Sequence, residues 1–148
     1  MKKAYDWAKR FKDSADGSFF FIGSGVNRAL AEYWVCKIHE VLGAKAEAQV
    51  PEQVGHAQLF SIDRGRDTIV FIGKGRNDRT RTIAGVLQKN GFRVHSLTDS
   101  STDIVTRMVE GSLYLQHLAL NLARMRGMKE CAFLADRSRL RLSNRLIY

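Results

Sequence analysis

Uninterrupted apolar runs alternate along this chain with stretches in which apolar residues recur every three or four positions. The runs at 19–22 and 67–73 predict strands, and their continuity is typical of a parallel sheet covered on both faces. The segment 93–98 predicts a third strand. Shorter stretches at 103–108 and 131–134 are expected to add a fourth and a fifth strand.

Helical periodicity marks four other segments, at 4–12, 26–42, 80–90 and 112–127. Strands that alternate with helices indicate a parallel sheet with helices on both sides. We therefore expect an α/β fold, a three-layer α/β/α sandwich of flavodoxin-like type with a mainly parallel five-stranded sheet. A single domain would span residues 1–148, with an N-terminal helix in 1–17 and the α/β core in 18–148.

The composition, 45% apolar and 26% charged, is ordinary for a globular domain. No apolar run approaches the roughly 18 residues of a membrane span, so no membrane partner is expected. The N-terminus lacks the apolar stretch of a secretory signal. Cys36 and Cys131 are the only cysteines, which favours free thiols and a cytoplasmic location.

Positive charge exceeds negative charge by +9, and the excess gathers at 74–81 and 137–145. A basic surface attracts anions, whether sugar phosphates, nucleic acid or an acidic protein. For any single arginine, a solvated basic face is the better explanation. Nucleic-acid binding is not expected, because the sequence shows neither an aromatic stacking platform nor a reading helix.

The first predicted strand ends in a glycine turn, Gly23-Ser24-Gly25, and the long helical pattern begins directly after it. This order places a helix N-terminus at the carboxyl end of a strand, where open α/β sheets bind anionic ligands. As a dinucleotide fingerprint the turn is incomplete, since Arg28 stands where a third glycine belongs. A ligand site and a plain tight turn are equally consistent with the pattern, and no cofactor is expected.

Groups that can move protons follow the turn. Lys37 and Glu40 lie three positions apart in the helical pattern, and His56 follows sixteen positions after Glu40 in an expected loop. Taken alone, the first two are best explained as a surface ion pair and the third as a lone histidine. The sequence shows no zinc-ligand spacing, nucleophile elbow or Walker A loop, so no metal is expected.

Taken together, the glycine turn, Lys37-Ile38-His39-Glu40, the spaced His56 and the strand at 67–73 resemble the sugar isomerase (SIS) domain family. The resemblance runs from about residue 18 to the end of the chain. It is closest to the second SIS half of glucosamine-6-phosphate synthase-like and phosphoglucose/phosphomannose isomerase-like enzymes. It implies a sugar-phosphate isomerase-like domain that interconverts aldose and ketose, or amino-sugar, phosphates through an enediol-type intermediate.

By position, the resemblance implies that Glu40 moves the proton between C1 and C2, a role suited to a partly buried carboxylate. It implies that His56 assists ring opening, often from a neighbouring subunit, and that Lys37 stabilises developing charge. The implied sugar contacts are Gly23, Ser24, Gly25 and Asn27. The implied partners are a sugar phosphate and a second protomer in a homodimer, or another SIS domain.

Two departures from the family pattern affect these roles. The Ser/Thr-rich phosphate loop is replaced by the sequence GKGRNDRT at 73–80, where Lys74 and Arg76 could substitute by charge or be solvated loop residues. The tail lysine of the synthase is missing, because only arginines follow Lys129, and arginine does not form a Schiff base. A non-catalytic phosphosugar-binding or regulatory domain is therefore the alternative to an isomerase.

Overall fold

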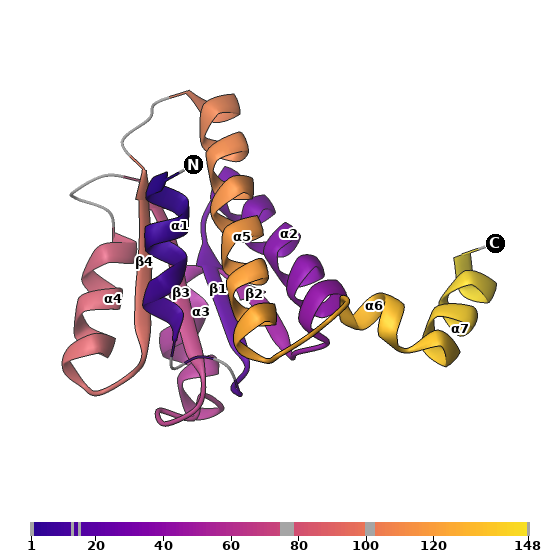
Figure 1. The fold of residues 1–148 in the computed structure, drawn as a ribbon. Helices are drawn as coiled ribbons and strands as arrows, with labels where there is room; N and C mark the ends of the chain where they lie inside the picture. Colours follow the sequence, from indigo (N-terminus) through magenta and orange to yellow (C-terminus); the bar gives the residue numbers. More distant parts are fainter. Residues whose placement is uncertain (1, 13, 15, 75–78, 100–102, 148) are drawn as a thin grey trace.

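Residues 2–147, apart from 13, 15, 75–78 and 100–102, are described by a computed structural model of the chain. A parallel sheet forms its middle layer, in the order β2-β1-β3-β4. The strands are β1 (Phe19–Gly23), β2 (Ala46–Gln49), β3 (Thr68–Lys74) and β4 (Val94–Asp99). The α/β class and the parallel sheet are thus confirmed (Figure 1).

Helices cover both faces of this sheet, which completes three layers (Figure 1). One face is covered by α1 (Lys2–Ala8), continued by the 3₁₀ turn η1 (Lys9–Phe11), by α2 (Val26–Leu42) and by α5 (Ile104–Met125). The other face is covered by α3 (Pro51–His56), the 3₁₀ turn η2 (Gln58–Phe60) and α4 (Arg79–Lys89). Two further helices, α6 (Ala132–Ala135) and α7 (Arg137–Ile147), extend away from the sheet.

The continuous apolar strands supply both cores at once, because successive side chains of a strand point to opposite faces. Phe19 and Phe21 of β1 pack in the core beneath α2 and α5, whereas Phe20 and Ile22 pack in the core beneath α3 and α4. Fully buried Trp34 of α2 contacts the ring of Phe21 edge-on, with 5.2 Å between ring centroids.

Local signals account for the bounds of α2, which agree with the predicted 26–42. The helix begins after Gly25, whose φ of 56° suits glycine alone. It ends at Gly43, which has left-handed backbone (φ 61°) and donates its N–H to the carbonyl oxygen of His39 at 3.0 Å.

The expected fourth and fifth strands are wrong. Residues 104–108 form the first turn of α5, because the carboxylate of Asp103 caps this helix by accepting the N–H of Thr106 at 2.6 Å. Residues 132–134 belong to α6. The sheet has four strands in the described part of the chain, and its edge strand β2 was not predicted.

Candidate functional site

A turn and a helix N-terminus meet at the carboxyl edge of β1. Gly23 ends the strand, and a Cβ atom at this position would lie 2.4 Å from the carbonyl oxygen of Asn27. Only glycine therefore allows the first turn of α2 to fold so closely over the strand. No side chain caps the N-terminus of α2, which leaves its partial positive charge facing outward from the strand end.

This edge is the topological switch point of the sheet. The chain leaves β1 toward β2 on one side, and β3 pairs with β1 on the other side. Open α/β sheets bind ligands in the crevice that such a switch creates at the carboxyl ends of the strands. Gly23, Ser24 and Gly25 lie in the turn next to this crevice, and Asn27 is buried beside it.

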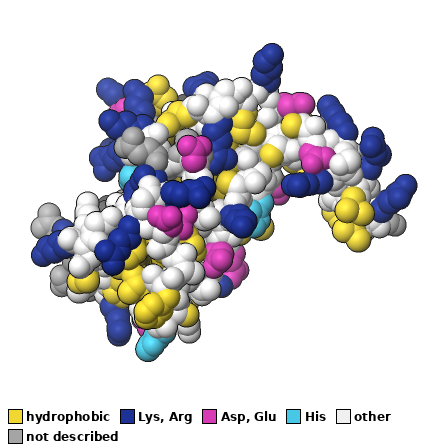
Figure 2. Space-filling view, turned by 90° about the horizontal axis from the view of Figure 1, so that it is seen from below, with side chains coloured by type: hydrophobic (Ala, Val, Ile, Leu, Met, Phe, Trp, Pro, Cys, Tyr) yellow, Lys and Arg dark blue, Asp and Glu magenta, His cyan; other side chains and the backbone are white. Residues whose placement is uncertain are grey.

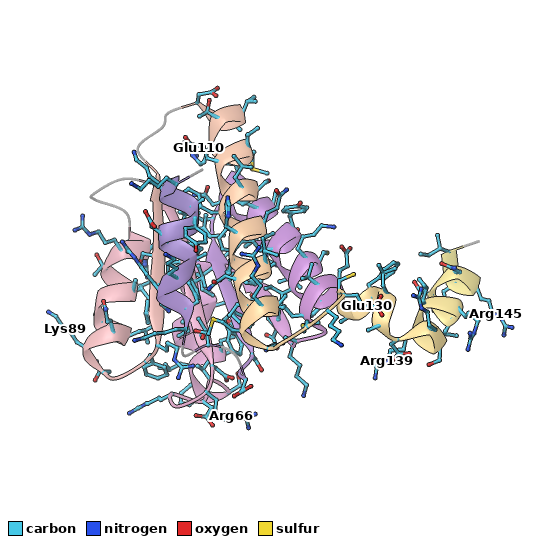
Figure 3. The ribbon with its side chains drawn as sticks, in the orientation of Figure 1. Arg66, Lys89, Glu110, Glu130, Arg139 and Arg145 are labelled. Carbon is cyan, nitrogen blue, oxygen red and sulfur yellow. The ribbon has the colours of Figure 1, made fainter. Side chains whose placement is uncertain are left out.

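A cavity of about 180 Å³ opens at this edge. Five elements contribute to its wall: α1, α2, β3, β4 and α5. Among its lining residues are Lys3, Asn27, Arg107, Glu110 and Tyr114. In Figure 3, Glu110 lies in the N-terminal part of α5, which is beside the carboxyl edge of the strands.

Two buried polar side chains stand out in this wall. Arg107 is only 5% exposed, and a buried guanidinium in a cavity wall provides a positive charge for an anion. Asn27 is also 5% exposed, and its Oδ1 has no hydrogen-bond partner among the described residues. Buried polar atoms are usually satisfied, so a ligand or water molecule is the natural partner for this oxygen.

Sequence reasoning missed Arg107 because it assigned 103–108 to a strand. A signal was available, since Arg107 continues the buried stripe of Gly111, Leu115, Leu118 and Leu122 at helical spacing. An arginine on such a stripe is an unusual residue to bury.

Lys37 and Glu40 lie far from this cavity along the same helix. At 1.5 Å per residue, the thirteen residues from Asn27 to Glu40 correspond to about 20 Å. Lys37 Nζ donates to Glu40 Oε2 at 2.5 Å, and this hydrogen bond raises the pKa of Lys37, with Coulombic attraction adding to it and partial burial opposing it. The Glu40 side chain is 47% exposed, so this protomer alone does not give it the partial burial that a catalytic role implies.

His56 is exposed and ends α3 instead of lying in a loop. Because α3 packs under the opposite face of the sheet from α2, His56 and Glu40 lie on different sides of one protomer. Glu40 lines a cleft between α2 and the two C-terminal helices, and His56 does not line that cleft. The catalytic roles of these residues stay predictions.

The basic loop after β3 lies mostly outside the described residues. Lys74 is the last residue of β3, and only its backbone is described, whereas Arg76 falls in the undescribed range 75–78. Elsewhere in the described ranges, no group of three or more His, Cys, Asp or Glu side chains is placed to hold a metal ion. No helix in these ranges is both long enough and apolar enough to cross a membrane.

No protein-family model and no curated protein matches the sequence. Solved structures do match its fold. One is the C-terminal domain of glucosamine-fructose-6-phosphate aminotransferase from Francisella tularensis, with a TM-score of 0.62 and 18% identity over 88% of this chain and 41% of that one. Another is glucosamine-6-phosphate deaminase from Thermotoga maritima, with a TM-score of 0.67 and 14% identity over 85% and 42%.

A third match is the sugar isomerase domain of an RpiR transcription factor from Sphaerobacter thermophilus. Its TM-score is 0.60, with 15% identity over 84% of this chain and 82% of that one. This chain therefore spans about two fifths of the first two matched chains and most of the third. The fold is that of the SIS domain, as the sequence resemblance implies, and the matched proteins include enzymes and a regulator.

Proposed function

We propose that this chain is an SIS-type domain that binds a phosphorylated sugar in the cavity at the carboxyl edge of its sheet. One observation carries the proposal: Arg107 and the first turn of α2 line the same cavity at the switch point. A guanidinium and a helix N-terminus both favour a phosphate group. Asn27 Oδ1 would accept a hydrogen bond from a sugar hydroxyl.

Phosphorylated sugars are proposed as ligands for two reasons. The matched structures include a glucosamine-6-phosphate deaminase, and their fold is the one found here. The charge of the cavity also suits a phosphate better than a neutral sugar, because two cations, Lys3 and Arg107, line it against one carboxylate, Glu110. The phosphate would take the place at the α2 N-terminus, and the sugar would extend along the side of the cavity formed by Tyr114 and Glu110.

Thermal-shift titration tests this proposal with glucosamine 6-phosphate, fructose 6-phosphate and the corresponding unphosphorylated sugars. We expect stabilisation by at least one phosphorylated sugar and little by the unphosphorylated ones. Arg107→Gln should weaken binding at least tenfold, since a hydrogen bond to a charged group contributes about 1.5–3 kcal/mol. Arg107→Lys, which keeps the charge, should retain part of the affinity.

Arg66→Gln is the matched control, because Arg66 is an exposed arginine near the amino edge of the sheet, at the opposite end from the cavity (Figure 3). It should bind like the wild type. Equal stabilisation by phosphorylated and unphosphorylated sugars, or undiminished binding by Arg107→Gln, would contradict the proposal.

Isomerase catalysis is the second candidate, and it would need a second protomer, because Glu40 lies about 20 Å along α2 from the cavity of its own chain. Glu40 is exposed at the end of α2, and His56 is exposed on the other face of the sheet, so a second protomer could bring its own copy of that histidine to Glu40. The turnover rate per protomer should then rise with protein concentration, as the dimer forms. It should disappear in Glu40→Gln, whereas sugar-phosphate binding should remain. If Glu40→Gln isomerises fructose 6-phosphate at the wild-type rate, Glu40 is not a catalytic residue.

A further inference from the structure

The helices α6 and α7 form a C-terminal arm, residues 132–147. In this arm α6 contacts α2, and α7 stands off the body of the domain (Figures 1 and 2). Within the described chain α7 lies against α6, and none of its side chains is buried. Leu142, Leu146 and Ile147 are 57%, 78% and 68% exposed. An isolated helix of 11 residues is only marginally stable in water, so α7 needs a further surface to pack on.

The two faces of α7 differ in chemistry. Arg137, Arg141 and Arg145 follow one another at spacings of four and share one face. Leu142 and Leu146 also lie four apart, and with Leu140 and Ile147 they supply most of the opposite side, where Arg139 and Ser143 lie between the two apolar pairs. The apolar side of α7 could therefore pack on a protein or lipid surface while Arg137, Arg141 and Arg145 face water or acidic groups.

The same chain carries an apolar groove of about 350 Å³ between α2 and α5. Its lining is mostly apolar and includes Val41, Leu115, Ala119, Leu120 and Ala123. Leu120 is among the exposed large hydrophobic residues of the domain. The groove ends at residues 128–131, which lead directly into α6, yet no residue of the arm itself lines it.

We propose that the arm is exchanged between two copies of this chain, with α7 of each copy lying in the α2–α5 groove of the other. Both halves of the contact exist on one chain, and α7 does not line the groove of its own chain. A two-fold axis beside the root of the arm makes the contact reciprocal and closes the assembly as a dimer.

The foot of the groove carries charges of both signs, from Lys129 and Glu130. The carboxylate of Glu130 lies 3.8 Å from the guanidinium of Arg137 at the root of the same chain's arm, so an arginine of this arm is already accommodated at this end of the groove. The cation of Lys37 on the groove wall is paired with Glu40. Between the last turn of α2 and the arm, a cleft of about 820 Å³ leaves room for the partner's arm to enter.

A basic amphipathic helix also suits an anionic lipid surface, but a lipid surface would leave the α2–α5 groove unfilled. The two occupants differ in what they require of Leu120. Arm exchange needs this groove residue, and lipid binding by α7 does not.

Sedimentation velocity on the full chain tests the proposal with two variants. The arm variant carries Leu142→Ser and Leu146→Ser, and the groove variant carries Leu120→Glu; all three side chains are exposed in a single chain, so its own fold should persist. We expect a wild-type dimer, and each variant should raise the dissociation constant at least about 30-fold. Val86→Ser, at an exposed apolar position on α4, is the control and should dimerise normally.

Mixing the two variants separates arm exchange from other dimers. The groove variant keeps its arm and the arm variant keeps its groove, so the mixture should recover one intact contact and form a heterodimer that neither variant forms alone. A wild-type monomer, a dimer insensitive to Leu120→Glu, or a mixture that stays monomeric would overturn the proposal. So would wild-type monomers that bind phosphatidylglycerol vesicles through the arm.

Discussion

His95 makes the stability of this domain depend on pH in a way that can be calculated. The ring lies on β4 and stacks on Phe11, with 3.8 Å between centroids and 22° between planes. Burial lowers its pKa from 6.5 to about 4, and the cations of Arg93 and Arg10 contribute to the shift. The folded chain therefore holds this imidazole neutral where the unfolded chain would protonate it.

The sign follows from proton linkage. Between pH 6.5 and 4 the unfolded state binds more protons at His95 than the folded state, so the free energy of unfolding falls as pH falls. The full pKa shift of His95 would lower the free energy of unfolding by about 2 kcal/mol between pH 7.5 and pH 5. Since the ring is partly exposed and solvent screens its neighbours, we expect about 1–2 kcal/mol.

Urea unfolding of wild type and His95→Phe at pH 7.5, 6 and 5 provides the assay. Phenylalanine keeps the stack on Phe11 and does not titrate, and all other ionisable groups are common to both proteins. The difference between the two free energies of unfolding should change by about 1–2 kcal/mol across this range, with the wild type losing more. A difference that stays constant with pH would refute the argument.

Other variants test the packing of α5 and α2 and should be measured by urea unfolding at pH 7.5. Gly111→Ala would place a Cβ atom 2.2 Å from Leu30 Cδ2, so we expect a loss of about 1–3 kcal/mol, whereas Gly85→Ala, with open space around it, should gain about 0.5–1 kcal/mol. Trp34 is fully buried, and its indole N–H has no hydrogen-bond partner among the described residues. Trp34→Phe should therefore lie within about 1 kcal/mol of wild type, while Trp34→Ala should cost about 3–5 kcal/mol. A loss near 3 kcal/mol for Trp34→Phe would contradict this expectation.

The elements that the sequence predicted well are those whose signals are local. The continuous apolar runs of β1 and β3 are typical of strands covered on both faces, and both fold as such strands. The stripe of α2 lies between Gly25 and Gly43, whose positive φ angles begin and end the helix without help from distant residues. The glycine turn at a strand end could be recognised from these features alone. The SIS resemblance needed the turn, the Lys37-Ile38-His39-Glu40 motif, the spaced His56 and the strand at 67–73 together.

Only the tertiary structure decided which segments pair as strands and how far apart the candidate site residues lie. Segments as short as 103–108 and 131–134 become strands only beside a partner strand, and both fold as helix. Glu40 and Asn27 share a helix, yet its length separates them by about 20 Å. Arg107 reaches the cavity because α5 crosses back over the carboxyl edge of the sheet. Sequence patterns thus determined which local structures form, and the three-dimensional packing of those structures determined which side chains share a cavity.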